Sequence, residues 1–281
     1  MPKGISIHIG LNSVSPKHYR DEFGRPWNGA LAACEADAKD MQALAQARGF
    51  TTNILLTEKA KARNVLNVLS RTVSQLQSGD TLFVTYSGHG GQVPDENNEE
   101  DDFNDETWVL YDRQLLDDEL YAVWSQFKPG VRIIVLSDSC HSGTATRELL
   151  MRDGHLQPAT PDTTGIRYRI LPIGVRGATY LAHKRLYKGK QKATPQGDHA
   201  VVQADVLLIS GCQDDQLSQD GDRNGLFTGT LLQVWNQGSF VGDYRKLHGD
   251  IIQHMPPEQQ PNLFTFGPTV AALTALPVFA I

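Results

Sequence analysis

The amino-acid sequence predicts an α/β protein built on a mainly parallel, six-stranded sheet with helices on both faces. Three largely apolar runs, at residues 82–84, 133–136 and 206–209, are typical of strands that are buried on both sides. Helical stretches separate the expected strands, and such alternation favours parallel pairing. With 281 residues, 40% of them hydrophobic, the chain is long enough to bury a substantial core.

The first half of the chain is expected to provide three strands and two helices. The stretch from Asn28 to Arg48 is rich in alanine and ends at Gly49, a residue type that commonly terminates helices. Thr57 is placed to cap a second helix, whose apolar residues recur at helical spacing. In order, the expected elements are a strand at 4–11, a polar loop at 12–27, a helix at 28–48, a strand at 51–56, a helix at 57–77 and a strand from 81 towards His89.

Two stretches further along the chain lack a regular pattern. Residues 91–107 carry many acidic side chains and are expected to form a loop. Residues 144–200 are rich in basic side chains without convincing periodicity, so we expect a long, mobile connection. The remaining expected elements are a short strand at 108–111, a helix at 117–127, strands at 132–138 and 205–210, helices at 226–237 and 243–255, and a last strand at 262–266. We expect one domain over residues 1–281, made of a larger part at about 1–143, the connection at about 144–200 and a smaller part at about 201–281.

Composition and charge argue against several classes of protein. The net charge of −6 is unlike that of a general nucleic-acid binder, which is usually basic. Residues 1–10 lack the pattern of a signal peptide, and no apolar run approaches the roughly 18 residues of a membrane span. The three cysteines, Cys34, Cys140 and Cys212, are an odd, sparse set without metal-type spacing, which indicates free thiols in a reducing compartment. We therefore expect a cytoplasmic protein.

Two of the buried strands lead into residues that suit nucleophilic catalysis. The strand at 132–138 runs into Cys140, and an earlier strand runs into His89, which precedes the cysteine by 140 − 89 = 51 residues. Carboxyl ends of parallel strands share one edge of the sheet, where ligands bind in this class of fold. Because a cysteine attacks as the thiolate and needs a base or a positive neighbour, we predict Cys140 as nucleophile and His89 as its partner. A small buried cysteine and a hydrogen-bonded turn histidine are the structural alternatives. His141 competes as base, although in an extended segment it would point away from Cys140.

The neighbours of this pair suggest how a substrate is held. The backbone N–H groups of Gly90 and Cys140 are the natural donors to a tetrahedral oxyanion. Asp138 lies two residues before Cys140, on the same strand face. Ser87 lies two residues before His89 and shares a face with it in the same way. The Asp138 carboxylate would repel the Cys140 thiolate unless the substrate placed a cation beside it. The two residues are therefore consistent with an acidic pocket that selects arginine or lysine. A hydrogen-bonded structural aspartate is the alternative.

Two motifs resemble those of the metacaspases, within the wider group of caspase-like cysteine peptidases. They are Ser87-Gly88-His89-Gly90 and, at the expected distance, Asp138-Ser139-Cys140-His141-Ser142-Gly143. Supporting matches are LAACEADA at residues 31–38 and SGCQDDQLS at residues 210–218. Together these matches extend over most of the chain, from about residue 4 to 237.

The resemblance implies a caspase-like fold, of the caspase-hemoglobinase type, and hydrolysis of peptide bonds after arginine or lysine. Cys140 would be the nucleophile and His89 the general base and acid, acting through a thioester acyl-enzyme. The pocket for the basic residue would be formed by Cys34, Asp37, Ser87 and Asp138. The first two of these are three residues apart and so share a face of the expected helix, for which ordinary helix packing is the alternative.

The resemblance also implies a possible cofactor, the calcium ion. Many metacaspases are calcium-activated, and Asp105, Asp117 and Asp118 match ligand positions of the family. Acidic side chains are the ligands that this hard cation prefers. Arg147 stands where the family often has an acid, and a solvated acidic loop is the alternative. The hydrolytic chemistry itself requires no cofactor, and the basic residues of 144–200 offer sites of self-cleavage.

We therefore expect a monomeric cysteine endopeptidase that acts on peptides or proteins with arginine or lysine at the cleaved position, and not on nucleic acid or membranes. A caspase-fold peptidase with another preference, or an inactive caspase-fold adaptor, is the alternative. A nucleotide-binding module is disfavoured because residues 87–91 match neither the Walker nor the Rossmann glycine pattern.

Overall fold

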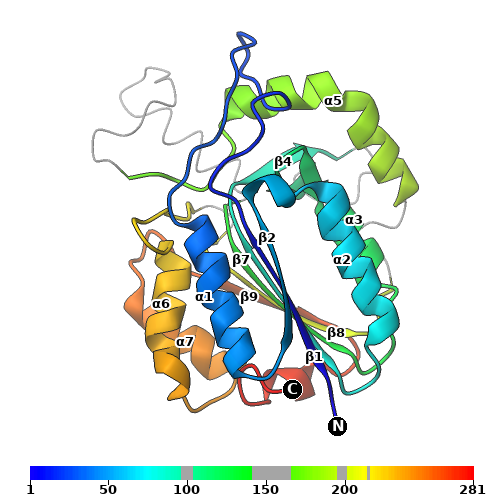
Figure 1. Cartoon of the computed structure of the whole chain (residues 1–281), viewed down its shortest axis with the longest axis vertical. Helices are drawn as coiled ribbons and strands as arrows, with labels where there is room; N and C mark the ends of the chain where they lie inside the picture. The colour runs from blue at the N-terminus through cyan, green and yellow to red at the C-terminus, as the bar shows by residue number, and fades with distance from the viewer. Residues whose placement is uncertain (96–103, 141–165, 195–200, 214–215) are drawn as a thin grey trace.

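A six-stranded sheet forms the centre of the molecule, as predicted (Figure 1). The computed structural model describes residues 1–95, 104–140, 166–194, 201–213 and 216–281. The order of the strands is β2 (Thr51–Leu56), β1 (Gly4–Gly10), β3 (Thr81–Ser87), β7 (Arg132–Asp138), β8 (Asp205–Ser210) and β9 (Asn262–Phe266). All neighbours pair in parallel except β9, which runs antiparallel to β8. The predicted α/β class and its mainly parallel sheet are confirmed.

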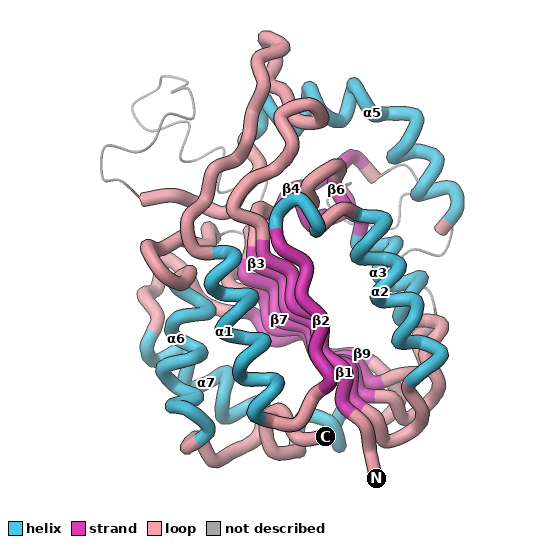
Figure 2. Tube along the Cα trace, viewed as in Figure 1, coloured by secondary structure: helices cyan, strands magenta, loops and turns pink. Residues whose placement is uncertain are grey.

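Helices cover both faces of this sheet (Figure 2). On one face lie α1 (Cys34–Ala47), α6 (Leu226–Trp235) and α7 (Tyr244–His254); on the other lie α2 (Ala62–Gln75) and α3 (Asp117–Trp124). Because successive strand residues point to opposite faces, each central strand contributes side chains to the cores on both sides of the sheet. Phe83 and Ile134 pack in the core with α1, α6 and α7, whereas Val84 and Val135 pack in the core with α2 and α3. Central strands buried on both sides explain the apolar runs in the sequence.

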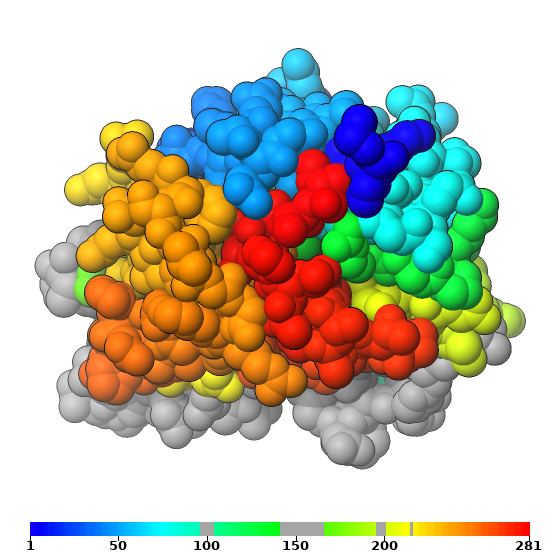
Figure 3. Space-filling view, turned by 90° about the horizontal axis from the view of Figure 1, so that it is seen from below, coloured from blue at the N-terminus to red at the C-terminus, as the bar shows by residue number. Residues whose placement is uncertain are grey.

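The chain ends beneath the sheet, at the end where β1 begins. α8 (Val270–Thr274) contacts β8, and the last residue, Ile281, lies against Gly4, where an added Cβ would be 2.6 Å from the Ile281 side chain. Figure 3 shows this C-terminal segment wedged between the amino terminus and the layer of α6 and α7. The loops that carry His89 and Cys140 lie at the opposite end of the sheet, where the parallel strands have their carboxyl ends.

A second, antiparallel sheet follows His89 directly. It consists of β4 (Gly90–Pro94), β5 (Asn104–Val109) and β6 (Gln114–Leu116). The expectation of a loop over 91–107 is therefore wrong for 91–94 and 104–107, while 96–103 lie outside the described residues. The acidic side chains belong to β5, the central strand of this small sheet, whose first residues alternate between half-buried and buried. Such a half-polar strand carries no long apolar run in the sequence.

A helix also lies within the stretch that we expected to be a mobile connection. α5 (Ile173–Ala193) packs Tyr180 and Tyr187 against Val93 and Leu116 of the second sheet. His183 has non-helical backbone angles (φ −114°), so the helix is kinked. The kink breaks the 3.6-residue period on which sequence recognition of a helix depends. The prediction is wrong for residues 173–193.

Two helix boundaries in the first half differ from expectation. α1 begins at Cys34, because the Asn28 carbonyl and the Leu31 N–H bond to residues 12–14 of the preceding loop. Gly29 is left-handed there (φ +53°), which no α-helix accommodates. The composition of 28–33 does not reveal these distant partners.

The helix expected from Thr57 begins later than predicted. Thr57 starts a short 3₁₀ turn, η1 (Thr57–Lys59), and its hydroxyl donates to Glu35 at 2.5 Å instead of capping a helix. α2 begins at Ala62, whose N–H is accepted by Asp112 at 2.9 Å. The helix start is thus capped from a distant part of the chain.

The remaining elements agree with prediction to within a few residues, except α8, which was not predicted. The late helices α6 and α7, the 3₁₀ turn η4 (Asn236–Gly238) after α6, and the last strand β9 lie where the sequence placed helices and a strand. No helix among the described residues combines the length and apolarity required to cross a bilayer.

Candidate active site

The ends of β3 and β7 lie side by side at the carboxyl edge of the sheet. Their register pairs Ser87 with Asp138, so the loops after them begin together. Gly90 packs directly on Cys140: a Cβ at Gly90 would lie 1.8 Å from the Cys140 carbonyl oxygen. Only glycine permits this approach. The parallel pairing therefore brings the His89 and Cys140 loops together, as the sequence predicted.

His89 is held by a carbonyl from the loop before α1. Its Nε2 lies 3.0 Å from the Gly29 oxygen, and the Trp27 ring lies beside the imidazole at 5.0 Å between centroids. A carbonyl only accepts, so Nε2 carries the proton of the neutral ring and Nδ1 has the free lone pair. The Nδ1 atom is buried and has no hydrogen-bond partner among the described residues.

Burial sets the charge of this imidazole. Desolvation lowers the pKa of His89 to about 4, although the Gly29 carbonyl opposes the shift. The ring is therefore neutral at pH 7, and its Nδ1 can accept a proton. A buried imidazole with one nitrogen oriented and the other available has the properties of a general base.

Cys140 is buried and points towards the loop after β8. Its Sγ accepts a hydrogen bond from the Ser218 N–H and lies 3.6 Å from the Ser218 oxygen. Cys140, Cys212 and Leu217 form a small cluster there. Among the described residues the thiol contacts Ser218 and the Cys212 thiol, and not His89. Catalytic hydrogen bonds often form only when the reacting substrate is in place. The lack of a Cys140–His89 hydrogen bond in this geometry is therefore compatible with the two residues acting together.

An extended segment of the same chain lies over Cys140. The carbonyl oxygen of Arg169 accepts two N–H groups, from Gly90 at 3.0 Å and from Cys140 at 3.1 Å. The Arg169 N–H donates to the Ser218 oxygen at 2.9 Å, and the Leu171 N–H donates to the Gly90 oxygen at 2.8 Å. Two backbone donors converging on one carbonyl are the arrangement that stabilises an oxyanion.

The Arg169 side chain fills an acidic pocket beside this carbonyl. Its Nη1 lies 2.8 Å from Asp138 Oδ2, and its Nη2 lies 2.7 Å from Asp37 Oδ2 and 3.0 Å from Asp220 Oδ1. Nη1 also donates to Ser87 Oγ at 2.9 Å. The guanidinium is fully buried, with 0% side-chain exposure. A charge so enclosed persists only because these partners compensate its lost hydration.

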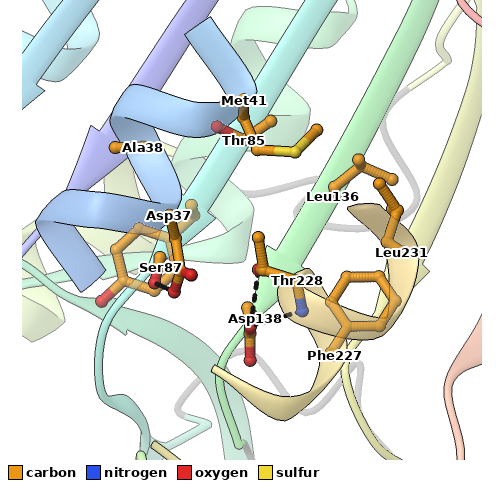
Figure 4. Close-up of a pocket in the computed structure, with 11 residues that line it drawn as sticks. Asp37, Ala38, Met41, Thr85, Ser87, Leu136, Asp138, Phe227, Thr228 and Leu231 are labelled. Atoms are coloured by element: carbon orange, nitrogen blue, oxygen red, sulfur yellow. Dashed lines mark hydrogen bonds between the residues drawn. The ribbon is translucent and has the colours of Figure 1, made fainter. Parts of the chain in front are cut away.

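The pocket is rigid because other residues hold its carboxylates (Figure 4). Asp138 accepts the Thr228 hydroxyl at 2.6 Å and N–H at 3.0 Å, and its other oxygen accepts the Ser218 hydroxyl at 2.6 Å. Asp37 accepts the Gly225 N–H at 3.1 Å. Burial raises the pKa of Asp37, and Asp138 adds to the rise, while Arg169 opposes it. Three carboxylates and one guanidinium thus form a pocket whose charge balance depends on the cation.

A small cavity lies behind the carboxylates, between α1, β3, β7 and α6 (Figure 4). Its volume of about 10 Å³ is room for about one water molecule. Met41, Leu136 and Leu231 form its apolar wall. This cavity is distinct from the acidic pocket, which the Arg169 side chain fills.

The four residues predicted for the pocket come together. Asp37, Ser87 and Asp138 contact the guanidinium, and the Cys34 thiol lies beside Ser87. Burial raises the pKa of Cys34 to about 12, so its thiol is neutral and shapes the pocket wall without adding charge.

Sequence reasoning missed four contributors: Gly29, Arg169, Ser218 and Asp220. Asp220 had a usable signature, because it lies two residues beyond the last serine of the 210–218 motif, and alternate residues of an extended segment share a face. Gly29 and Arg169 had none, since a carbonyl partner and one basic residue among many leave no pattern.

The three predicted calcium ligands lie apart from this pocket, on β5 and at the start of α3. Asp105 Oδ2 accepts the Gln191 amide at 2.5 Å, and Asp118 Oδ2 accepts the Thr194 hydroxyl at 3.2 Å. Asp117 accepts the backbone N–H of Asp118 at 3.0 Å. No group of three or more histidine, cysteine or acidic side chains arranged to hold a metal ion occurs within the described ranges. The donors are right in kind for calcium, but in this arrangement they do not form a site, and calcium binding stays a prediction.

A thiol at a strand end, a neutral imidazole and paired backbone donors on one carbonyl are the groups that nucleophilic cysteine chemistry on a parallel α/β sheet would use. The family follows from comparison with known proteins: the family model for the caspase domain (Peptidase_C14) matches residues 15–270. The chain belongs to this caspase-domain family, and its sheet and helix layers are those of the caspase fold.

Individual relatives agree with the family. Metacaspase-1A of Aspergillus fumigatus is 32% identical over 255 residues, which cover 82% of this chain and 59% of that protein. Metacaspase-1 of Emericella nidulans is 31% identical, over 82% of this chain and 60% of that protein. The chain thus spans about three fifths of the length of these curated relatives. A crystal structure of protein GSU0716 from Geobacter sulfurreducens is similar over 99% of both chains, with 47% identity and a TM-score of 0.87.

Proposed function

We propose that the protein is a cysteine endopeptidase that hydrolyses peptide bonds after arginine or lysine. The observation that carries this proposal is the position of Arg169. Its guanidinium is paired with Asp37, Asp138 and Asp220, while its carbonyl oxygen lies between the Gly90 and Cys140 N–H groups. An arginine residue of a substrate in the same position would have its scissile carbonyl beside the thiol.

In this proposal Cys140 attacks the carbonyl carbon and His89 takes the thiol proton through Nδ1. The lowered pKa keeps His89 neutral at pH 7, so that Nδ1 can accept a proton, and the contact with Gly29 supports the orientation of the ring. Gly90 and Cys140 supply the oxyanion donors. The C–N bond then breaks as His89 gives the thiol proton to the departing amine. The resulting thioester is hydrolysed by a water molecule that His89 deprotonates, which restores the thiol.

The acidic pocket supports the preference for basic residues. Arginine offers two nitrogens to separate carboxylates, as Arg169 does, whereas lysine offers one ammonium group, so we expect arginine to be cleaved about 10-fold faster than lysine. An aspartate in the same place would bring a fourth negative charge among buried carboxylates, and we expect no measurable cleavage after it.

The test is hydrolysis of three fluorogenic peptides that differ only in their last residue: arginine, lysine or aspartate. The proteins are the wild type, Cys140→Ala and Arg169→Gln, the last because Arg169 occupies the pocket of the intact chain. Cleavage after arginine and lysine that disappears in Cys140→Ala is the expected result. Equal cleavage after aspartate, or activity that survives in Cys140→Ala, would overturn the proposal. Silence of every protein on every peptide would favour an adaptor.

Calcium activation is a separate proposal, on Asp105, Asp117 and Asp118. Running the peptide assay with calcium and with a chelator tests it, and Asp105→Asn is the matching variant. A rate increase by calcium that Asp105→Asn abolishes supports the proposal; equal rates with calcium and chelator contradict it. The monomeric state and the cytoplasmic location remain predictions.

A further inference from the structure

We propose that Cys212 is a resolving thiol for Cys140: hydrogen peroxide converts the two cysteines into a disulfide, which stops peptide hydrolysis until a dithiol reduces it. The inference rests on the proposed function, because it requires Cys140 to be the nucleophile. It adds a reversible oxidation site at the nucleophile itself.

The fold brings the two cysteines to the same place. β7 and β8 are parallel neighbours whose register pairs Ser137 with Ser210. The Gly211 N–H donates to the Ser137 oxygen at 2.8 Å, so the pairing continues past the end of β8. Cys140 and Cys212 follow the paired residues by 140 − 137 = 3 and 212 − 210 = 2 positions. Adjacent strands lie about 4.8 Å apart, within the range of about 4.4 to 6.8 Å between the Cα atoms of a disulfide, so the backbone spacing suits this bond.

The side chains of both cysteines meet in one small cluster. Cys140, Cys212 and Leu217 pack together there, and both thiols are free and buried. The Cys212 sulfur lies 3.6 Å from the oxygen of Ser139, the residue that precedes Cys140, and it hydrogen-bonds with the Cys140 thiol. The two sulfur atoms are therefore in contact before any oxidation.

The two thiols differ in how readily they react with an oxidant. The hydrogen bond with Cys140, together with burial, raises the pKa of Cys212 well above its usual range. Cys212 is therefore a protonated thiol at pH 7 and a poor first target for peroxide, which reacts with thiolates. In the proposed mechanism His89 takes the proton of Cys140, so Cys140 is the thiol that meets the oxidant first.

Peroxide reaches Cys140 by the route that a substrate takes. The carbonyl oxygen of Arg169 lies over Cys140, bonded to the N–H groups of Gly90 and Cys140. This segment must move aside before another peptide can bind in its place. Hydrogen peroxide is much smaller than a peptide, so an opening that admits the substrate also admits the oxidant.

The reaction balances with one molecule of hydrogen peroxide. The Cys140 thiolate attacks one peroxide oxygen: an S–O bond forms, the O–O bond breaks, and the departing hydroxide takes the proton from His89 and becomes water. The Cys212 sulfur then attacks the sulfenic sulfur of Cys140: the S–S bond forms, the S–O bond breaks, and the hydroxide leaves with the Cys212 proton as a second water. The two thiols lose two electrons and the peroxide gains them. A dithiol restores both thiols by exchange.

The partner thiol decides whether this oxidation is reversible. A sulfenic acid that stays in peroxide is oxidised further to a sulfinic acid, which a dithiol does not reduce. With Cys212 in contact, the disulfide forms first and prevents that step. We expect excess peroxide to lower the hydrolysis of arginine peptides at least about 10-fold in the wild type, and dithiothreitol to restore it. Cys212→Ser should be inactivated as deeply and recover about 10-fold less of its own activity.

The test combines mass spectrometry with the activity assay. The wild type is treated with excess peroxide, quenched with catalase, denatured, alkylated and digested with trypsin without reduction. We expect an intact mass lower by about 2 Da, the loss of two hydrogen atoms. The tryptic peptide 133–147, with Cys140, should be linked to 193–223, with Cys212, while 21–39, with Cys34, is alkylated. A bond between Cys34 and Cys140, or a sulfinic Cys140 beside an alkylated Cys212, would overturn the inference.

Cys34→Ala is the matched control for the Cys212 variants. It also removes a buried thiol, but Cys34 lies on α1 in the wall of the acidic pocket, outside the cluster of Cys140 and Cys212. It should form the same linked peptides as the wild type. Cys212→Ser and Cys212→Ala should instead gain about 32 Da on peptide 133–147, the mass of a sulfinic acid. Each protein is compared with its own untreated activity, and the wild-type peptide map decides alone if the Cys212 variants do not fold. Equal recovery of the wild type and the Cys212 variants would overturn the inference.

Failure of this inference can be told from failure of the proposed function. If the reduced protein hydrolyses arginine peptides and peroxide produces no bond between Cys140 and Cys212, the resolving role is wrong and the peptidase stands. If the reduced protein hydrolyses no arginine or lysine peptide, the proposed function is wrong, and the switch over hydrolysis is wrong with it even where the disulfide forms.

Discussion

Two groups of buried acids in this molecule contact different kinds of side chain. Asp37, Asp138 and Asp220 surround a guanidinium, whereas Asp105 and Asp118 accept hydrogen bonds from the neutral side chains of α5 and its end. Charge-assisted pairs in a dry site are strong and selective, and neutral hydrogen bonds are weaker and easily exchanged. The first group is therefore suited to recognise a cation of fixed shape, and the second to contribute to the packing of α5 against the second sheet.

Removal of the nucleophile should have the largest effect and leave both acid groups unchanged. Cys140→Ala loses one sulfur atom from a small cluster, while the strand core of β7 lies upstream of it. We expect hydrolysis of arginine peptides to fall to background, by about 10³-fold or more, with an unaltered unfolding midpoint. Turnover that persists would mean that another residue is the nucleophile.

Neutralising one acid of the first group should weaken the cleavage of arginine peptides without changing the reactivity of the Cys140 thiol. Asp138→Asn loses the charge that pairs with the guanidinium but keeps a side chain of the same size. We expect kcat/KM for arginine peptides to fall by about 10²-fold, the loss typical of breaking one buried charge pair. The rate of alkylation of Cys140 by iodoacetamide should stay within about 2-fold, since the thiol bonds to Ser218 and not to Asp138. An equal loss in both assays would show that Asp138 is structural.

Loss of the Arg169 cation should lower the stability of the protein more than loss of the neutral Gln191 side chain. Arg169→Gln leaves three buried carboxylates without their counter-ion, and we expect the free energy of unfolding to fall by about 3 kcal/mol. Gln191→Ala removes a neutral amide from Asp105 and should cost about 1 kcal/mol. Urea unfolding of both variants beside the wild type makes the measurement. Equal losses would show that the first group is not held together by charge.

The smallest expected effect is the pH dependence of stability that comes from the buried imidazole of His8. Burial lowers the pKa of His8 to about 3, and its nitrogens contact the hydroxyl groups of Thr85 and Ser6. Above pH 6.5, the ordinary value, neither state binds the proton; below it the unfolded chain does and the folded chain does not until about pH 3. Stability is therefore present above pH 6.5 and lost as the pH falls towards 3.

Between pH 6 and 5 we expect His8 to lower the free energy of unfolding by about 1 kcal/mol. His89, with a pKa lowered to about 4, adds a parallel loss, so the difference between wild type and His8→Gln isolates His8. Urea unfolding at both pH values gives that difference. Identical slopes for the two proteins would mean that His8 is protonated equally in both states.

Much of the site was predictable because strand geometry is local. Apolar runs fixed the positions of β3, β7 and β8, and parallel pairing then required the loops with His89 and Cys140 to share an edge. Period-two spacing placed Ser87 and Asp138 on the pocket side. The second sheet and α5 were missed because β4 and β5 are short and half-polar and because α5 is kinked at His183.

The sequence by itself determined the fold class, the positions of the cysteine and the histidine, and the four pocket residues that match the family motifs. Only the tertiary structure decided that Gly29 orients His89, that Asp220 completes the pocket and that Arg169 occupies it. These contacts join residues 31 to 132 positions apart in sequence, as the separations of Arg169 from Asp138 and from Asp37 show. Propensity and periodicity act over a few residues, whereas such partners are chosen by the packing of distant segments.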